Sequence, residues 1–375
     1  MSEPERIPLA RPEVGPREEE LVLEVLRSGR LSLGPMQERF ERSFAAFLGV
    51  EDAVAVSSGT AALHLGVRAL GWGPGDEVLT SPFSFVASSN CLLYEGATPV
   101  FCDIDPETLN VSAAAAAGAA GPRTAGILGV DIFGRPADWP ALEKLAEERG
   151  LGLLDDACEA LGASDSEGVR LGARGIVSTF AFYANKQLTT GEGGMVIPRN
   201  AAEAERMRSE RNQGRAPDMA WLDHDRLGFN YRLSEIAAAV GVAQLERLDS
   251  ALTAREKLAG AYAEALSGID GLELPGAGAS PERRGWFVYV VLLPEEADRD
   301  AVVDSLGGDG IEAKAYLPCI HLMPHYRDRF GFEGGEFPVA EAVSARSLAL
   351  PFFPAMSAAM VDRVQAALRS ALSAR

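Results

Sequence analysis

The sequence predicts an α/β protein, with a large domain on a mostly parallel sheet and a smaller C-terminal α+β domain. Between about residues 50 and 200, short apolar runs alternate with helical stretches, as in a parallel sheet covered on both faces. A long helical stretch then starts near Ser234, and strand and helix patterns resume beyond it. A chain of 375 residues fits two domains, which we place at 1–250 and 251–375.

The elements follow from local patterns. The segment 60–70 places Leu63, Val67 and Leu70 on one face and stops at Gly71, which predicts a helix with a glycine cap. The alanine-rich stretch 112–120 predicts a surface helix. The expected strands of the large domain are AVAV (53–56), EVLTSP (77–82), TPVFCDI (98–104), GILGVDIF (126–133), GLGLLDDA (150–157), STFAFY (178–183) and GGMVIP (193–198). The C-terminal domain is expected to contain strands at 286–293 and 311–317, a helix through 301–306 and a last helix from about Ser357.

Composition limits the partners. Lysine plus arginine number 35 against 54 acids, and a net charge of −19 disfavours nucleic acid and anionic membrane surfaces. The four cysteines form no CxxC pair, which favours a reducing compartment. The first ten residues lack the apolar core of a secretory signal, and no apolar run is long enough to span a membrane. We therefore expect a cytoplasmic protein.

The segment SSGTAALHL (57–65) is a candidate phosphate site. It joins an expected strand to an expected helix, and a helix N-terminus offers unpaired N–H groups and the positive end of the helix dipole. Gly59 allows close backbone approach, and Thr60 adds a hydroxyl donor. Taken alone, this segment is more simply an ordinary helix cap.

The segment LLDDACEALGA (153–163) ends an expected buried strand in Asp155 and Asp156. Ligands of open α/β sheets bind beyond the carboxyl ends of the strands. An acid at that place could bind a metal ion, pair with a protonated ring nitrogen, or cap a turn. The chain contains no GxxxxGK[ST] motif, which argues against a nucleotide hydrolase.

The segment STFAFYANKQLTTGEGGMVI (178–197) places Lys186 between two expected strands, just before a glycine-rich turn. Desolvation near apolar residues makes a lysine amine available for Schiff-base chemistry. A surface lysine with a buried stem is the alternative for this segment in isolation. The order phosphate cup, acid, lysine is what pyridoxal 5′-phosphate (PLP) requires: an anchor for its phosphate, a carboxylate for its ring nitrogen and an amine for its aldehyde.

These segments resemble the DegT/DnrJ/EryC1/StrS family of PLP-dependent sugar aminotransferases, and the resemblance runs nearly from end to end. The matching wording is IPLARPEVG and LRSGRLSLGP (within 7–35), SSGTAALHL, GDEVLTSPFSFVASSN, TPVFCDIDPETLN, DIFGRPADW, LLDDACEALGA, FAFYANKQLTTGEGGM and LGFNYRLSEIAAAVG (227–241). The wording around the lysine is similar to that of perosamine-synthase-like members. The resemblance implies PLP fold type I and a homodimer with a shared active site.

The resemblance also implies roles for single residues. Lys186 matches the lysine that forms the Schiff base and relays the proton, and Asp156 matches the partner of the pyridine nitrogen. Glu159 matches the residue beside the phenolic oxygen of PLP. Gly59, Thr60 and Ala61 match the phosphate cup, and Phe85 matches the ring that stacks on the cofactor. Asn230 matches the residue that reaches the phosphate of the neighbouring subunit, and Arg232 beside it is a candidate for substrate or phosphate contact.

One position departs from the family pattern. Many members carry a phosphate-binding serine five residues before the lysine, where this chain has Ala181. Because strand residues alternate between faces, Thr179 is a better replacement candidate than Ser178.

The segment CIHLMPHY (319–326) superficially resembles a metal site. Pro324 prevents its two histidines from sharing a regular helix face, and no acid cluster accompanies them in the sequence, so we expect no metal. Family members place a sugar-contacting histidine on a loop of this kind, and His321 is the candidate here.

The reaction implied by the resemblance is ping-pong transamination from an amino-acid donor, L-glutamate, to a 4-keto-6-deoxy hexose linked to a nucleotide. A few members carry histidine in place of the lysine and dehydrate sugars, so Lys186 favours transamination. Two alternatives stay open: a cyclitol ketone of the inosose type as the amino acceptor, and a non-enzymatic regulatory role.

Overall fold

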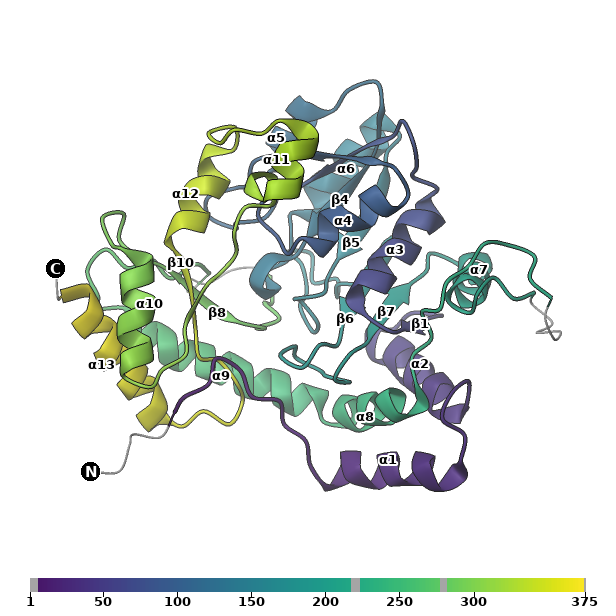
Figure 1. The fold of residues 1–375 in the computed structure, drawn as a ribbon, viewed down its shortest axis with the longest axis horizontal. Helices are drawn as coiled ribbons and strands as arrows, with labels where there is room; N and C mark the ends of the chain where they lie inside the picture. Colours follow the sequence, from purple (N-terminus) through teal and green to yellow (C-terminus); the bar gives the residue numbers. More distant parts are fainter. Residues whose placement is uncertain (1–5, 217–222, 277–281, 374–375) are drawn as a thin grey trace.

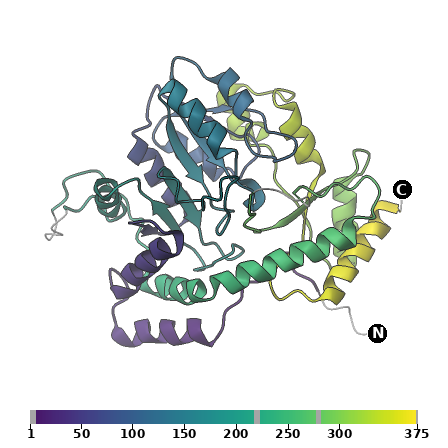
Figure 2. The same ribbon diagram turned by 180° about the vertical axis from the view of Figure 1, so that it is seen from behind.

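Two sheets organise the protein, which we describe from a computed structural model for residues 6–216, 223–276 and 282–373 (Figures 1 and 2). The larger sheet has seven strands in the order β1-β7-β6-β5-β4-β2-β3. Its strands are β1 (Val54–Val56), β2 (Glu77–Thr80), β3 (Thr98–Phe101), β4 (Thr124–Val130), β5 (Gly152–Asp156), β6 (Val177–Ala181) and β7 (Gly194–Ile197). Only β7 runs antiparallel to its neighbours in this sheet. The mostly parallel sheet and each of its strands were predicted from the sequence.

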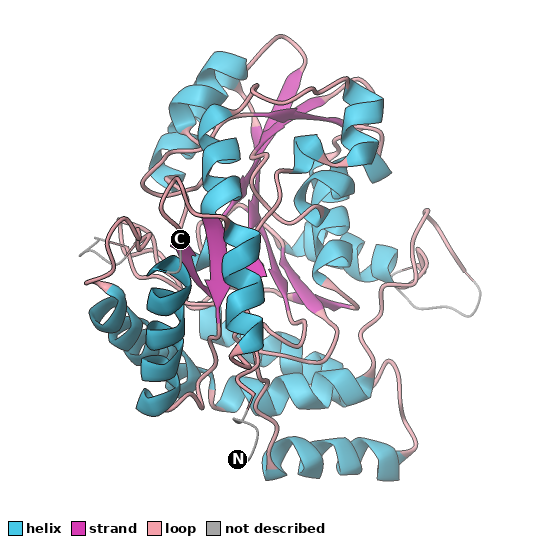
Figure 3. Ribbon diagram, turned by 60° about the vertical axis from the view of Figure 1, so that its left-hand side comes forward, coloured by secondary structure: helices cyan, strands magenta, loops and turns pink. Residues whose placement is uncertain are grey.

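Helices cover both faces of this sheet, as the alternation of elements predicted (Figure 3). Neighbouring strand residues point to opposite faces, so Leu154 joins one apolar cluster and Leu153 the other. On the Leu154 face lie α3 (Gly59–Leu70), α4 (Ala87–Tyr94) and α7 (Ala201–Arg211). On the Leu153 face lie α1 (Pro16–Ser28), α2 (Pro35–Leu48), α5 (Ala113–Ala119), α6 (Trp139–Arg149) and α8 (Glu235–Glu246). The 3-10 turn η1 (Ile132–Gly134) follows β4.

The smaller sheet has three antiparallel strands in the order β8-β10-β9. These are β8 (Tyr289–Leu292), β9 (Lys314–Ala315) and β10 (Ser347–Leu350). Strands β8 and β10 share a core with α9 (Leu248–Leu266), α10 (Arg299–Gly308) and α13 (Ala358–Ser373), whereas both residues of β9 are exposed. The turn η2 (Ile320–Leu322), α11 (Pro324–Phe330) and α12 (Pro338–Arg346) lie between β9 and β10. The N-terminal segment crosses to this core, where Ile7 is buried and its N–H donates to the Gly310 carbonyl at 2.9 Å.

Two predicted elements differ in extent from the sequence expectation. The stretch beginning near Ser234 is two helices, α8 and α9, that meet at Arg247. The strand expected at 311–317 is only two residues long as β9. Residue 250, our expected domain boundary, lies in the first turn of α9, and the division itself stays a prediction. Within the described ranges, no helix is long and apolar enough to cross a membrane.

Candidate functional site

A cavity of about 480 Å³ opens at the carboxyl ends of β5 and β6, beside the N-terminus of α3. It brings together residues from 58 to 317, including six of the predicted site residues. Its lining consists of Ser58, Gly59, Thr60, Leu63, Ser84, Phe85, Ala87, Ser88, Val130, Asp156, Cys158, Glu159, Ala181, Tyr183, Asn185, Lys186, Glu192, Gly193, Tyr316 and Leu317. Of the other predicted residues, Ala61 is buried behind the cup, and Asn230, Arg232 and His321 do not line the cavity.

Lys186 lies in the loop between β6 and β7, with its side chain mostly buried. Its Nζ is 3.5 Å from Glu159 Oε1 and 3.9 Å from the centre of the Phe287 ring. The carboxylate and the aromatic face both attract an ammonium group, and together they hold the Nζ in the cavity. This is the placement that a lysine needs to reach a bound aldehyde.

Asp156 ends β5 and is buried in the wall of the cavity. Its Oδ2 accepts a hydrogen bond from the Ser88 hydroxyl at 2.7 Å, and its Oδ1 accepts one from the Cys158 N–H at 3.2 Å. The two donors hold the carboxyl group in one orientation in the cavity wall. An oriented acid is therefore available to a ring nitrogen.

Glu159 follows on the same loop and is also buried. Burial raises the pKa of Glu159, and the nearby Lys186 ammonium opposes this rise. Its Oε2 accepts a hydrogen bond from the Phe133 N–H at 2.9 Å, which fixes the carboxyl beside the lysine. Tyr316, which follows β9 of the smaller sheet, also lines the cavity. Burial raises the pKa of its phenol, and the charge of Glu159 raises it further.

The segment 57–65, which we predict to be a phosphate cup, contains the N-cap and the first turns of α3. Ser58 caps the helix and its Oγ accepts from the Ala61 N–H at 3.1 Å, so the first open N–H groups are those of Gly59 and Thr60. A Cβ at Gly59 would lie 2.6 Å from the Ala181 Cβ, so only glycine fits against β6 here. At this position the start of α3 therefore packs closely against the end of β6.

Because residue 181 is alanine, another hydroxyl group would have to donate to a phosphate in the cup. Thr179, our better replacement candidate, donates to the Asp155 carbonyl at 3.2 Å and does not line the cavity. Ser178 is buried and likewise absent from the lining. Ser58 does line it, and its hydroxyl hydrogen stays available while its oxygen accepts from Ala61.

The predicted residues outside the cavity have other surroundings. Asn230 is exposed, and Arg232 Nη1 donates to Asn212 Oδ1 at 3.0 Å. Phe85 lines the cavity with 60% of its surface exposed, so it is open to a stacking partner. The roles of these residues stay predictions.

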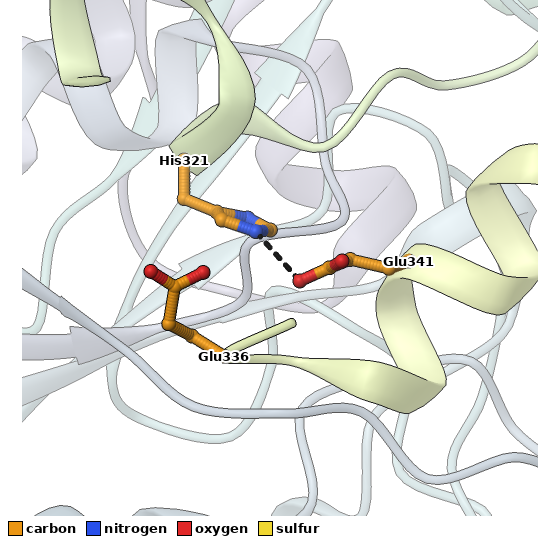
Figure 4. Close-up of side chains that lie close together, drawn as sticks. All are labelled: His321, Glu336 and Glu341. Atoms are coloured by element: carbon orange, nitrogen blue, oxygen red, sulfur yellow. Dashed lines mark hydrogen bonds and ion pairs between the residues drawn. The ribbon is translucent and has the colours of Figure 1, made fainter. Parts of the chain in front are cut away.

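His321 is buried and lies apart from the cavity, in a cluster with the exposed Glu336 and the half-buried Glu341 (Figure 4). Its Nε2 is 3.1 Å from Glu341 Oε1, an acid partner that the local sequence did not reveal. The carboxylate oxygens of Glu341 also accept from the Gly335 N–H, and those of Glu336 accept from the N–H groups of Glu333 and Gly334. These hydrogen bonds explain the cluster as the closure of the loop between α11 and α12. The predicted contact of His321 with a sugar stays a prediction.

Several residues that line the cavity or contact Lys186 were not predicted from the sequence. Tyr316 and Phe287 come from the C-terminal third of the chain, and no local pattern connects them with Lys186. Ser88 lies inside the family-like segment GDEVLTSPFSFVASSN, so its position was visible while its bond to Asp156 was not. Ser58 stood in the predicted cup and was passed over in favour of Gly59.

Comparisons with known proteins agree along the whole chain. Residues 12–369 match the sequence profile of the DegT/DnrJ/EryC1/StrS aminotransferase family. The chain is 38% identical over 376 residues to GDP-perosamine synthase of Caulobacter vibrioides, which covers 99% of this chain and 100% of that protein. The structure is similar to that of DesV from S. venezuelae in complex with a ketimine intermediate, with a TM-score of 0.92, 35% identity and 98% of each chain covered. It is also similar to 3-amino-5-hydroxybenzoic acid synthase, with a TM-score of 0.91, 30% identity, and 98% of this chain and 99% of that one covered.

The fold and these similarities define a PLP-dependent aminotransferase. The chain belongs to the DegT/DnrJ/EryC1/StrS aminotransferase family. The predicted family, fold type, enzyme class and cofactor are thereby confirmed, and the coarse function is that of a sugar aminotransferase.

The cavity residues fit the cofactor of this family. Open N–H groups at the start of α3 suit a phosphate. Asp156, which accepts two hydrogen bonds, suits a ring nitrogen, and Lys186 Nζ suits an aldehyde. All three line one cavity, which is the arrangement that a single PLP molecule requires.

Proposed function

We propose that this enzyme transfers an amino group from L-glutamate to the keto group of a nucleotide-linked 4-keto-6-deoxy sugar. One observation carries the proposal: Lys186, Asp156 and the N-terminus of α3 line the same cavity. PLP supplies an electron sink that stabilises negative charge at the carbon losing its proton. The residues of this chain supply orientation, proton transfer and exclusion of water.

Each residue has a defined task in this proposal. Lys186 Nζ would hold the cofactor through its aldehyde and would serve as the group that takes up and returns the proton. Asp156 keeps the ring nitrogen protonated, and Ser88 keeps Asp156 oriented. Glu159 lies beside the lysine and would face the phenolic oxygen of bound PLP. Gly59, Thr60 and Ser58 would hold the phosphate, and Phe85, which lines the same cavity, would stack on the ring.

The amino acceptor is proposed from the names of the relatives. GDP-perosamine synthases of Caulobacter vibrioides and Vibrio cholerae are 38% and 35% identical to this chain. The family-like wording NKQLTTGEGG around Lys186 points the same way. We therefore place a nucleotide diphosphate sugar ahead of other ketones.

A carbocyclic ketone is the second candidate. The chain is 30% identical to 3-amino-5-hydroxybenzoic acid synthase, whose name refers to a carbocyclic product and not to a sugar. An inosose-type cyclitol presents a comparable ring ketone without a nucleotide. The two candidates differ in whether the amino acceptor must carry a nucleotide to be a substrate.

We also propose that the enzyme acts as a cytoplasmic homodimer with shared active sites. Asn230 is exposed and lies outside the cavity of its own chain, so a role at a phosphate requires a second chain. Leu227 on the same segment is 70% exposed, which suits burial against a partner.

The test starts from protein saturated with PLP. L-Glutamate should convert the visible absorption of the bound cofactor to that of its amine form, and a GDP- or dTDP-linked 4-keto-6-deoxy sugar should restore it. Lys186→Ala should abolish the conversion. Restoration by an inosose and by none of the nucleotide sugars would favour the second candidate, and failure of PLP to bind would contradict the proposal.

A further inference from the structure

Three aspartates meet at the ends of β4 and β5. Asp155 and Asp156 end β5, and Asp131 directly follows β4. All three are at least 95% buried, and the Asp131 N–H donates to the Asp156 carbonyl at 3.2 Å. Because strand residues alternate, Asp156 faces the cavity while Asp155 points to the other face of the sheet. Three ionised carboxyls in such a place would repel one another strongly.

Hydrogen bonds are unevenly distributed over these acids. Both oxygens of Asp156 have donors, from Ser88 and Cys158. Asp131 Oδ1 accepts from the Ala137 N–H at 2.7 Å and from Trp139 Nε1 at 3.0 Å.

One oxygen on each of the other two acids is left over. Asp131 Oδ2 and Asp155 Oδ1 are buried without a donor among the described residues. The two carboxyls nevertheless lie within hydrogen-bonding reach of each other. Two carboxylate oxygens can bond only if one of them carries a proton, and a single proton between them satisfies both.

We propose that Asp131 and Asp155 share one proton and thereby act as positioning residues that keep the proton off Asp156. The proton lies between the carboxyl groups of Asp131 and Asp155, where it completes the hydrogen bond between them. Asp156 already has two donors and stays a carboxylate for the ring nitrogen of PLP. The link to the ring nitrogen rests on the role of Asp156 in the proposed function. The shared proton itself does not.

The surroundings of the pair favour the protonated form. Burial is the largest cause that raises the pKa of both Asp131 and Asp155, and the charge of Asp155 raises that of Asp131 further. The charge of Asp156 also raises the pKa of Asp155, whereas hydrogen bonds with Asp131, with the Ser178 hydroxyl on β6 and with the Gly172 N–H oppose the rise. The proton is therefore favoured on Asp131, with Asp155 as the acceptor of its hydrogen bond.

The pair has a consequence for stability against pH. Burial raises the pKa of both acids above the value of about 4 that they have in an unfolded chain. The folded protein then holds a proton that the unfolded chain has lost, so stability falls as pH rises from about 4 through the folded pKa. In Asp155→Asn the amide donates to Asp131 without titrating, and this part of the pH dependence should disappear.

The first test measures the proton directly in protein saturated with PLP. Infrared difference spectra should show the C=O stretch of a protonated carboxyl at pH 7 in the wild type, and its loss in Asp155→Asn and in Asp131→Asn. Asp300→Asn, an exposed acid on α10, is the matched control and should keep the band. Glu159→Gln is measured in parallel because burial also raises the pKa of Glu159.

The second measurement follows Tm between pH 5 and pH 8. The fall of Tm with pH should be shallower in Asp155→Asn than in the wild type, and unchanged in Asp300→Asn. With ¹⁵N-labelled PLP bound, the ring nitrogen should stay protonated in Asp155→Asn at pH 7, because the pair keeps a charge of −1. In the double Asn variant the ring nitrogen should deprotonate at lower pH.

The proposal is overturned if both single variants keep the infrared band and the wild-type Tm slope. It is also overturned if the wild type lacks the band once the contribution of Glu159 is subtracted, a result that needs no pair variant to fold. A protein that binds PLP poorly would contradict the proposed function and leave the band and the slope intact, so the two failures are distinguishable.

Discussion

Asp156 receives its orientation from a residue outside its own strand. The Ser88 hydroxyl on α4 donates to Asp156 Oδ2 at 2.7 Å, within the buried wall of the cavity. A hydrogen bond to a charged group contributes about 1.5–3 kcal/mol. In the proposed function, the bond orients the carboxyl group toward the ring nitrogen of PLP.

Ser88→Ala should lower kcat about tenfold, which corresponds to about 1.4 kcal/mol of transition-state stabilisation. Ser89→Ala, a buried neighbour on the same helix whose hydroxyl is not bonded to Asp156, is the matched control and should keep the wild-type rate. Steady-state rates with L-glutamate and a keto-sugar check this. Equal rates for the two variants would show that Ser88 has no effect through Asp156.

Ala181 offers a gain in cofactor affinity. Its Cβ would meet a Cβ on Gly59 at 2.6 Å, so the side chain lies directly against the start of α3. Ala181→Ser adds a hydroxyl donor beside the cup, and PLP should bind about tenfold more tightly through one charge-assisted hydrogen bond. Equilibrium titration of the apoprotein measures Kd. Ala202→Ser, exposed on α7, should leave Kd unchanged, and an unchanged Kd for Ala181→Ser would place the phosphate elsewhere.

Much of the site could be predicted at the scale of single residues because its parts occur in short motifs. Gly59, Asp156 and Lys186 each stand at the end of a recognisable strand, where parallel sheets place ligands. Tyr316 and Phe287 could not be predicted, because their approach to the lysine depends on how the small sheet packs. The alternation of strand faces favoured Thr179, whose hydroxyl the structure instead pairs with the Asp155 carbonyl.

At the scale of elements, α3 joins the cavity to the core. Its first turn forms the cup, and the rest of the helix packs against β5, β6 and β7. The glycine cap predicted at Gly71 is present, with φ of 73°. We therefore expect a change at the first turn to affect both cofactor binding and packing.

Gly59→Ala should lower the free energy of unfolding by about 1–3 kcal/mol and weaken PLP binding, because the added methyl group overlaps Ala181. Gly260→Ala is the control inside α9, where an added Cβ meets nothing within 4 Å. It should stabilise by about 0.5–1 kcal/mol, since alanine is the better helix former. Urea unfolding with and without PLP checks both variants. Stability and Kd unchanged in Gly59→Ala would contradict the close approach.

Local patterns predicted elements well and their ends less well. The helical pattern of the sequence continues through Arg247, yet the helix is interrupted at this residue. The Arg247 side chain donates hydrogen bonds to Glu13 and Glu18, before and within α1. That tertiary contact has no signature in the sequence around residue 247. The strand β10 was missed because a run of four residues, SLAL, carries too little pattern to separate it from a helix end.

At the scale of the whole molecule, the position of Asn230 predicts that two chains build each site. A mixture of Lys186→Ala and Asn230→Ala subunits should recover activity, because one site of each heterodimer then has Lys186 from one chain and Asn230 from the other. Activity is measured before and after subunit exchange, with light scattering to confirm the dimer. An absence of recovery in proven heterodimers would place the action of Asn230 within its own chain.

The central claim is that Lys186 carries the cofactor, and chemical trapping tests it most directly. Borohydride reduction of the PLP-loaded protein makes the link to a lysine permanent, and peptide mass spectrometry then locates it. The account predicts a phosphopyridoxyl group on Lys186 and none on Lys144, Lys257 or Lys314. A label on another lysine, or on no lysine at all, would contradict it.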